Sequence, residues 1–186
     1  MARWQPGARE RLQQSALDLF LEHGFERTTV AEIAARADLT ERTFYRHFAD
    51  KREVLFDGQD RLLHAFVDAV AAAPVEASPR ELAEAAVVGS RDFFTEERRP
   101  WSRRRHQAIS SEDGLRERES LKMGSLAAAV AQALRERGVE DPLAELAADA
   151  AISVFRVSFV QWIAPEETRT MGEIQSELFA AQRALG

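Results

Sequence analysis

Six polar side chains lie close together in one short stretch of the sequence. They are Glu41, Arg42, Thr43, Tyr45, Arg46 and His47. Guanidinium, hydroxyl, phenol and imidazole groups donate hydrogen bonds to phosphate oxygens and to the edges of bases. Phe44 and Phe48 are four residues apart, so in a helix they share one apolar face. The spacing therefore predicts a short helix that buries its phenylalanines and turns the polar groups outward, as a nucleic-acid contact surface.

A second short helix precedes this one. Thr29 and Glu32 have the spacing of a capping box, which predicts a helix over 30–37. Thr40 is the predicted cap of the following helix, over 41–48. Two short capped helices joined by a three-residue turn are typical of a helix-turn-helix, whose second helix enters the major groove of DNA.

The rest of the chain has helical periodicity. The predicted helices cover about 7–23, 30–37, 41–48, 51–72, 79–95, 101–110, 112–137, 142–163 and 170–185. Residues 152–159 alternate between apolar and polar, but a lone strand would have no partner and helix formers precede it, so we expect helix there. Gly124 is expected to interrupt the helix over 112–137. The sequence thus predicts an all-α fold of about nine helices.

Composition and charge narrow the possible functions. The chain has 25 basic and 31 acidic residues, so its overall charge does not favour binding to DNA. Residues 36–52, however, hold five basic and three acidic groups. DNA binding would therefore depend on this local positive face. Of the basic residues 23 are Arg, which we interpret as a compositional habit. The absence of Cys excludes disulfides and thiolate metal sites. We expect no metal site, cofactor, signal peptide or membrane segment, and a cytoplasmic protein.

The N-terminal stretch resembles a known family of DNA-binding domains. The matching positions are Gly24-Phe25, Thr28 to Ala34, Leu39 to Phe48, Lys51 and Leu55. Together they resemble the DNA-binding domain of the TetR/AcrR family of bacterial transcriptional regulators. The resemblance implies a helix-turn-helix domain at residues 1–50 and a helical effector-binding and dimerisation domain at residues 51–186. It also implies a homodimer on double-stranded operator DNA, released by a small-molecule effector.

The resemblance also implies roles for individual residues. Phosphate contacts are expected from Thr29, Thr40, Tyr45, His47 and Lys51. Base edges are expected to be read by Arg42 and Thr43, with Glu41 and Arg46 beside them. Arg42 stands where many members have a small residue, and it could bind guanine bidentately or bind a phosphate. Glu41 could accept from a cytosine amino group, or hold only Arg42 or solvent.

A second departure from the family pattern lies in the turn. Asp38 occupies the position of the usual glycine. Because Asp tolerates the left-handed conformation better than most residues, we expect Asp38 to adopt it.

Two further sites are predicted in the C-terminal part. Helix 142–163 is apolar on more than one face, which indicates burial against its own core and against a partner. The predicted dimer interface consists of Val160, Ile163, Ile174, Leu178 and Phe179. The predicted effector pocket consists of Phe66, Phe93, Trp101, His106, Met123, Phe155, Phe159 and Trp162, which suits a bulky, mostly apolar effector. Each of these residues also fits an ordinary core.

Other interpretations remain open. Arg156 could form an ion pair at the dimer rim or bind an anionic group of an effector. The basic run 98–105 has acidic neighbours, which favours a solvated helix surface over a second nucleic-acid patch. Helix 51–72 is expected to be the only element that touches both domains, and so to transmit effector binding.

The sequence allows two alternatives to an effector-responsive regulator. A helical DNA-binding or interaction module without an effector remains possible on this pattern. An all-α enzyme is disfavoured, since no nucleotide-binding or nucleophile motif occurs in the sequence.

Overall fold

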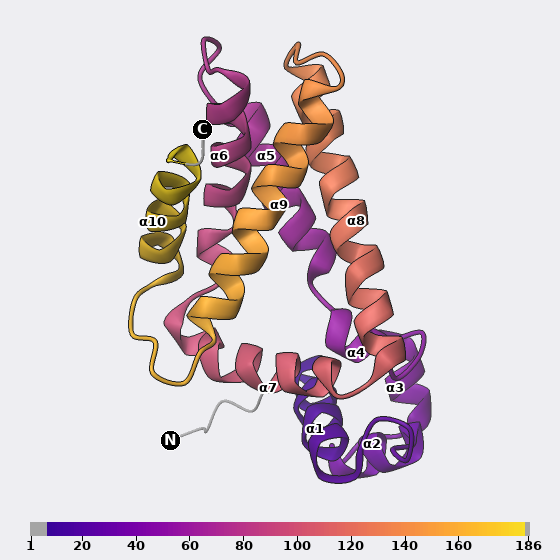
Figure 1. The fold of residues 1–186 in the computed structure, drawn as a ribbon. Coiled ribbons are helices and arrows are strands. Elements are labelled where there is room, and N and C mark those ends of the chain that lie inside the picture. Colours follow the sequence, from indigo (N-terminus) through magenta and orange to yellow (C-terminus); the bar gives the residue numbers. More distant parts are fainter. Residues whose placement is uncertain (1–6, 185–186) are drawn as a thin grey trace, which may run out of the picture. The chain divides into compact units, whose positions relative to one another are not determined.

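The computed structural model describes residues 7–184, and this range is all-helical (Figure 1). The helices are α1 Ala8–His23, α2 Val30–Arg36, α3 Glu41–His47, α4 Glu53–Phe56, α5 Gln59–Ala72, α6 Pro79–Gly89, η1 Arg91–Phe93, η2 Glu96–Arg98, α7 Arg99–Ser110, α8 Asp113–Glu136, α9 Leu143–Trp162 and α10 Met171–Arg183. The all-α prediction is confirmed, and 152–159 lies in α9. The predicted helix end at Leu185 and the first six residues lie outside the described range.

The chain divides into two compact units. The first runs up to Asp57 and includes residues 104–118, and the second contains residues 58–103 and 119 onward. Residues 104–118 join the first unit because their arginines bind it. Arg104 pairs with Asp18 of α1. Arg118 pairs with Glu53 of α4. The first unit is therefore larger than the predicted 1–50, and it is not one continuous stretch of chain.

The first unit is held by the apolar sides of α1 to α4. Its core residues are Leu12, Leu17, Phe20, Ile33, Phe44, Phe48 and Leu55, all buried. The predicted turn chemistry is confirmed, since Asp38 has a φ of 54° and so adopts the left-handed conformation. Thr29 and Glu32 form the predicted capping box, and Thr40 caps α3. These local signals fix where the two short helices begin and how the chain turns between them.

The prediction of one helix over 51–72 is wrong. The chain breaks at Asp57 and Gly58 into α4 and α5. Gly58 has a φ of 83°, which a residue with a side chain adopts only with strain. The side chain of Asp57 accepts hydrogen bonds from Arg9 and Gln13 of α1, so α4 ends inside the first unit.

The prediction that helix 51–72 is the only element that touches both domains is wrong as well. Helices α7 and α8 each contribute residues to both units.

Two other helix boundaries differ from the predictions. The predicted helix 79–95 ends at Gly89, where the hydroxyl of Ser90 donates to the Val87 carbonyl at 2.6 Å, and two 3-10 turns follow. Gly124 does not interrupt α8, because one glycine removes no backbone hydrogen bond from a helix.

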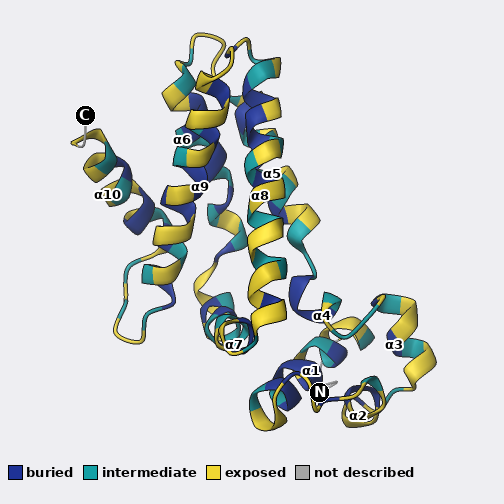
Figure 2. Ribbon diagram, turned by 45° about the vertical axis from the view of Figure 1, so that its right-hand side comes forward, coloured by how far each residue is buried: buried dark blue, intermediate teal, exposed yellow. Residues whose placement is uncertain are grey.

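In the second unit, α5 packs on α6, α6 packs on α9, and α9 packs on α10. Gly89 permits the close approach of α6 to α5, since an added Cβ would lie 2.3 Å from the Ala65 carbonyl oxygen. The core collects along these contacts, shown dark blue in Figure 2. Ile163, Ile174 and Phe179, which the sequence assigned to a dimer interface, are buried in this core.

Candidate nucleic-acid interface

Helix α3 turns a row of polar side chains outward. Its first turn is fixed by Thr40, whose hydroxyl accepts from the Thr43 N–H at 3.2 Å. Phe44 is fully buried, and its ring meets that of Tyr45 edge-on at 5.5 Å. The Tyr45 side chain is 57% exposed. Glu41, Arg42 and Arg46 are also exposed on this helix. Figure 2 shows the exposed parts of α3 in yellow.

The arginines of α3 carry charge that the protein itself does not neutralise. Within the described range, neither Arg42 nor Arg46 forms an ion pair or a hydrogen bond, and Glu41 does not hold Arg42. Neighbouring arginines behave differently. Arg36 binds Glu22 at 2.8 Å, and Arg52 binds Asp50 at 2.9 Å. Two unneutralised cations and a phenol on one short helix are free to meet an anionic partner.

The threonine hydroxyls predicted as phosphate contacts serve as helix caps. The Thr29 hydroxyl donates to the Glu32 carboxylate at 2.8 Å, and its backbone N–H does the same. These bonds hold the pKa of Glu32 below its ordinary value. The hydroxyls of Thr40 and Thr43 lie 3.1 Å apart. Thr29 and Thr40 are exposed and Thr43 is half-buried, but a phosphate contact by Thr29 would compete with Glu32.

His47 and Lys51 face inward more than the sequence predicted. His47 is half-buried, and its Nε2 is buried without a hydrogen-bond partner in the described structure. The Lys51 Nζ donates to the carbonyls of Phe25 at 2.8 Å and Thr28 at 3.0 Å, with a longer bond to Glu26 at 3.3 Å. Lys51 therefore binds the turn between α1 and α2, a contact between residues far apart in the sequence.

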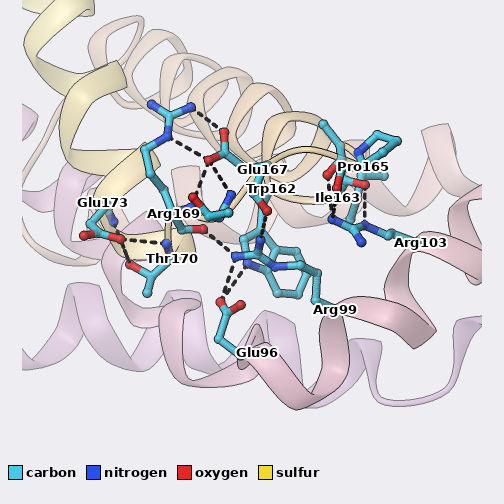
Figure 3. A network of polar contacts seen from close by, with 12 residues as sticks. Glu96, Arg99, Arg103, Trp162, Ile163, Pro165, Glu167, Arg169, Thr170 and Glu173 are labelled. Carbon is cyan, nitrogen blue, oxygen red and sulfur yellow. Dashed lines mark hydrogen bonds and ion pairs between the residues drawn. The ribbon is translucent and has the colours of Figure 1, made fainter.

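The basic run 98–105 is not the solvated surface that its acidic neighbours indicated. Arg99 is 6% exposed and donates to the carbonyls of Glu167 and Arg169 and to the carboxylate of Glu96 (Figure 3). Arg103 donates to carbonyls at the end of α9, including that of Ile163 at 2.8 Å. The prediction is wrong because carbonyls left over at a helix C-terminus and in a loop are good acceptors for arginine.

The loop between α9 and α10 contains a bidentate ion pair, in which two nitrogens of Arg169 donate to the two carboxylate oxygens of Glu167. Arg169 and the Thr168 N–H donate to the carboxylate of Glu167 (Figure 3). The hydrogen bonds from Arg169 are the main reason that the pKa of Glu167 falls from 4.5 to about 2. A second carboxylate, that of Glu177, also binds Arg169.

The residues predicted to form an effector pocket are only partly brought together. The rings of Phe66 and Phe155 lie 5.2 Å apart, and those of Phe159 and Trp162 lie 6.3 Å apart. Phe94 connects them, at 5.6 Å from both Phe155 and Phe159. The side chain of Phe94 is itself buried.

The remaining predicted pocket residues are more scattered. Phe93 packs beside Phe94 at 5.1 Å, and Met123 packs against the same core. Trp101 is half-buried on α7. His106 belongs to the first unit, whereas the other seven predicted residues belong to the second. Among the predicted residues, Phe66, Phe155, Phe159 and Trp162 form a continuous series of ring contacts.

An exposed apolar stripe runs along α9. Leu143, Leu146, Val157 and Val160 are all exposed, and half-buried Ala150 and exposed Ser153 lie between them at spacings of three and four residues. Of the predicted interface residues, Val160 is 55% exposed and Leu178 packs partly against the core. Arg156 is exposed beside the stripe and forms no ion pair within residues 7–184.

The described residues form neither a metal site nor a membrane-spanning helix. No group of three or more His, Asp or Glu side chains is placed to hold a metal ion there. No helix in that range is long and apolar enough to cross a bilayer.

Family models match both parts of the chain. The model for bacterial regulatory proteins of the tetR family matches residues 13–57. The model for the MftR C-terminal domain matches residues 77–183, more than half of the chain.

Individual proteins match as well. The HTH-type transcriptional regulator TcmR of Streptomyces glaucescens is 41% identical over 71 residues, which cover 38% of this chain and 31% of TcmR. The match thus spans about a third of that relative's length. PfmR of Thermus thermophilus, a TetR family regulator, is 26% identical with a TM-score of 0.54, over 91% of this chain and 95% of that one. A transcriptional regulator of Pseudomonas aeruginosa PAO1 shares the fold at 21% identity and a TM-score of 0.65, over 100% and 94%.

Proposed function

This chain belongs to the TetR family of bacterial regulatory proteins, and we propose that it is a one-component repressor that binds a near-palindromic operator as a homodimer. As a member of the family it is a transcriptional regulator with an N-terminal helix-turn-helix. In our proposal a bulky, mostly apolar effector binds the second unit and releases the DNA.

The observation that supports operator binding best is the outer face of α3. This helix exposes Arg42, Tyr45 and Arg46, and neither guanidinium is paired within the described chain. Most other arginines of the described chain are engaged by carboxylates or carbonyls, so two unpaired guanidiniums on one short helix are uncommon in this chain. The net charge of −6 disfavours DNA binding over the rest of the surface and restricts it to this face.

The direct test is to select an operator from random DNA and to measure its affinity by fluorescence anisotropy. The double variant Arg42→Ala with Arg46→Ala is expected to lose about 100-fold or more, since such contacts contribute about 1–3 kcal/mol each. Arg80→Ala, on α6 of the second unit, is the control and should bind as wild type. Equal operator affinity in wild type and the double variant would sink the proposal.

The exposed stripe on α9 supports dimerisation through a second copy of the chain. Apolar residues at alternating three- and four-residue spacings form the seam of paired helices. Leu143, Leu146, Val157 and Val160 stay exposed in the monomer, which leaves this seam uncovered. We infer that the stripe, and not the buried Ile163, Ile174 and Phe179, forms the centre of the interface.

The charges beside the stripe fit an antiparallel pairing. Asp149 and Arg156 are both exposed, lie seven residues apart, and occupy the same flanking row of α9. When two such helices cross in opposite directions about a point midway between Ile152 and Ser153, each Asp149 lies opposite the partner's Arg156. This self-complementary pattern is what a two-fold interface requires, and it supports a role for Arg156 at the interface over one in the pocket.

The effector proposal rests on the aromatic cluster of the second unit. Phe66, Phe94, Phe155, Phe159 and Trp162 pack together edge-on or tilted. Half-buried Phe93, Phe159 and Met123 lie at its margin, where an apolar compound could insert. The same close packing also suits a regulator without an effector, which is therefore the second candidate function.

Calorimetry separates these two candidates. An aromatic compound that binds should bind more weakly when operator DNA is present, and operator should bind more weakly by the same factor when the compound is present. A typical coupling is about 1–3 kcal/mol. If a compound binds with equal affinity in the presence and absence of operator, the two sites are not coupled. That result would contradict the sensor function but not the DNA binding.

A further inference from the structure

The side chain of Lys51 is surrounded by the main chain of the turn that precedes α2. Its ammonium donates to the carbonyls of Phe25, Glu26 and Thr28, at 2.8, 3.3 and 3.0 Å. The same nitrogen lies 4.3 Å from the centre of the Phe25 ring. A lysine ammonium has three protons. The three carbonyls therefore account for all of its donors.

The turn that Lys51 binds determines how the helix-turn-helix starts. Thr28 is buried, and its hydroxyl donates to the carbonyl of Gly24 at 2.9 Å. The next residue, Thr29, caps α2. Lys51 itself stands just before α4, after α3 has ended. One side chain thus connects the entry to the helix-turn-helix with the exit from it.

We propose that Lys51 is a positioning residue that fixes the turn 25–28, and through it α2 and α3, and that it makes no phosphate contact of its own. The inference rests on the proposed DNA binding. It follows from the contrast with Arg42 and Arg46, which are exposed and unpaired in the described chain, whereas Lys51 is half-buried with every donor engaged. To reach a phosphate, the ammonium would have to abandon three carbonyls and an aromatic ring.

The chain offers a direct test on the unaltered protein, because Lys51 and Lys122 are its only lysines. Protein labelled with ¹⁵N at lysine gives two ammonium signals by NMR. We expect the Lys51 ammonium protons to exchange slowly with water in the free protein, and to keep their shift and slow exchange when the selected operator is bound. Lys122 on α8 provides the reference signal. A Lys51 signal that moves or loses its protection in the complex, while Lys122 stays unchanged, would overturn the proposal.

The salt dependence of binding gives an independent measurement. Each phosphate contact contributes about 0.9 to the slope of log affinity against log salt concentration, so a contact made by both copies contributes about 1.8. We expect Lys51→Met to lower affinity at least tenfold for all DNA sequences with an unchanged slope, and to speed amide exchange at 25–30. A slope reduced by about 1.8 would show a phosphate contact and contradict us.

Failure of this inference can be told apart from failure of the proposed function. If wild-type protein selects no operator, DNA binding itself fails. If wild type binds an operator and Arg42→Ala with Arg46→Ala abolishes binding, the function stands, and the Lys51 measurements decide the inference alone. Should Lys51→Met fail to fold, which amide exchange and circular dichroism would reveal, the NMR measurement on wild type still decides it.

Discussion

Arginine has two opposite roles in this molecule. On α3, Arg42 and Arg46 are exposed and unpaired within the described range. Arg103 and Arg137, by contrast, donate to carbonyls at the ends of α9 and α5. The planar guanidinium presents its donors in a fixed fork, so it can bind two or three such carbonyls at once. The 23 arginines are thus partly a means of capping helices, and our interpretation of them as a compositional habit missed this.

Arg42→Ala is expected to change which operator bases are preferred. If the guanidinium reads a base, its loss relaxes preference at one or two positions of each half-site, by about 1–3 kcal/mol per base. Selection of binding sites from random DNA, with wild type and variant side by side, would show it. An unchanged consensus with uniformly weaker binding would make Arg42 a phosphate contact.

The pair of Glu167 and Arg169 predicts a dependence of stability on acid. The pKa of Glu167 lies at about 2 in the folded protein and ordinarily at 4.5. Since folding lowers this pKa, the stabilisation is complete above pH 4.5 and is lost as the pH falls toward about 2. Denaturant unfolding of wild type and Glu167→Gln should show a difference at pH 6 that shrinks between these values. Glu166→Gln, at an exposed neighbouring carboxylate that forms no hydrogen bond in the described chain, is the matched control.

Residue-level prediction succeeded where partners are close in sequence. Thr29 and Glu32 are three residues apart, so their capping bonds followed from the spacing. Lys51 and the turn it binds are 23 to 26 residues apart. Nothing local distinguishes a lysine that binds carbonyls from one that meets phosphate, so its role could not be predicted.

At the scale of elements, glycines determine where helices break and how closely they pack. Gly58 separates α4 from α5 through its left-handed conformation, which the sequence alone did not reveal because Asp57 and Gly58 sit in an otherwise helical pattern. Gly89 instead lies within the contact of α6 with α5. Which of these roles a glycine has depends on its neighbours in space.

Gly89→Ala and Gly124→Ala should change stability in opposite directions. An added Cβ at Gly89 would lie 2.3 Å from the Ala65 carbonyl oxygen and 2.6 Å from the Ala69 Cβ. Such overpacking costs about 1–3 kcal/mol or more. At Gly124, in α8, nothing lies within 4 Å, and alanine should add about 0.5–1 kcal/mol. Chemical denaturation of both variants checks this, and a destabilised Gly124→Ala would contradict the open surroundings of that site.

At the scale of the whole molecule, we infer that a second copy of the chain covers the exposed stripe on α9. The sequence predicted an interface on the last two helices, but assigned Ile163, Ile174 and Phe179 to it, which are core residues. Apolar periodicity alone does not tell which apolar face of a helix meets its own core and which is left uncovered.

Val160→Asp should therefore produce monomers with little operator affinity. A charge at this position of the seam would be buried without a partner, and a single helix-turn-helix makes too few contacts for tight binding. Sedimentation at micromolar concentration measures the state of association. Leu121→Asp on α8 is the matched control, since Leu121 is similarly exposed but lies off the stripe. A variant at Val160 that remains dimeric would rule out this interface.

The first unit is assembled from two separate stretches of chain, and this affects attempts to exchange it between regulators. A hybrid protein joined at residue 57 would take α1 to α4 from one parent and residues 104–118 from the other. Asp18, Glu53 and the Leu55 carbonyl would then face a foreign sequence in place of Arg104, Arg118 and Arg105. DNA specificity can be transplanted in this protein only when both stretches move together, so a graft needs a second piece from the middle of the chain.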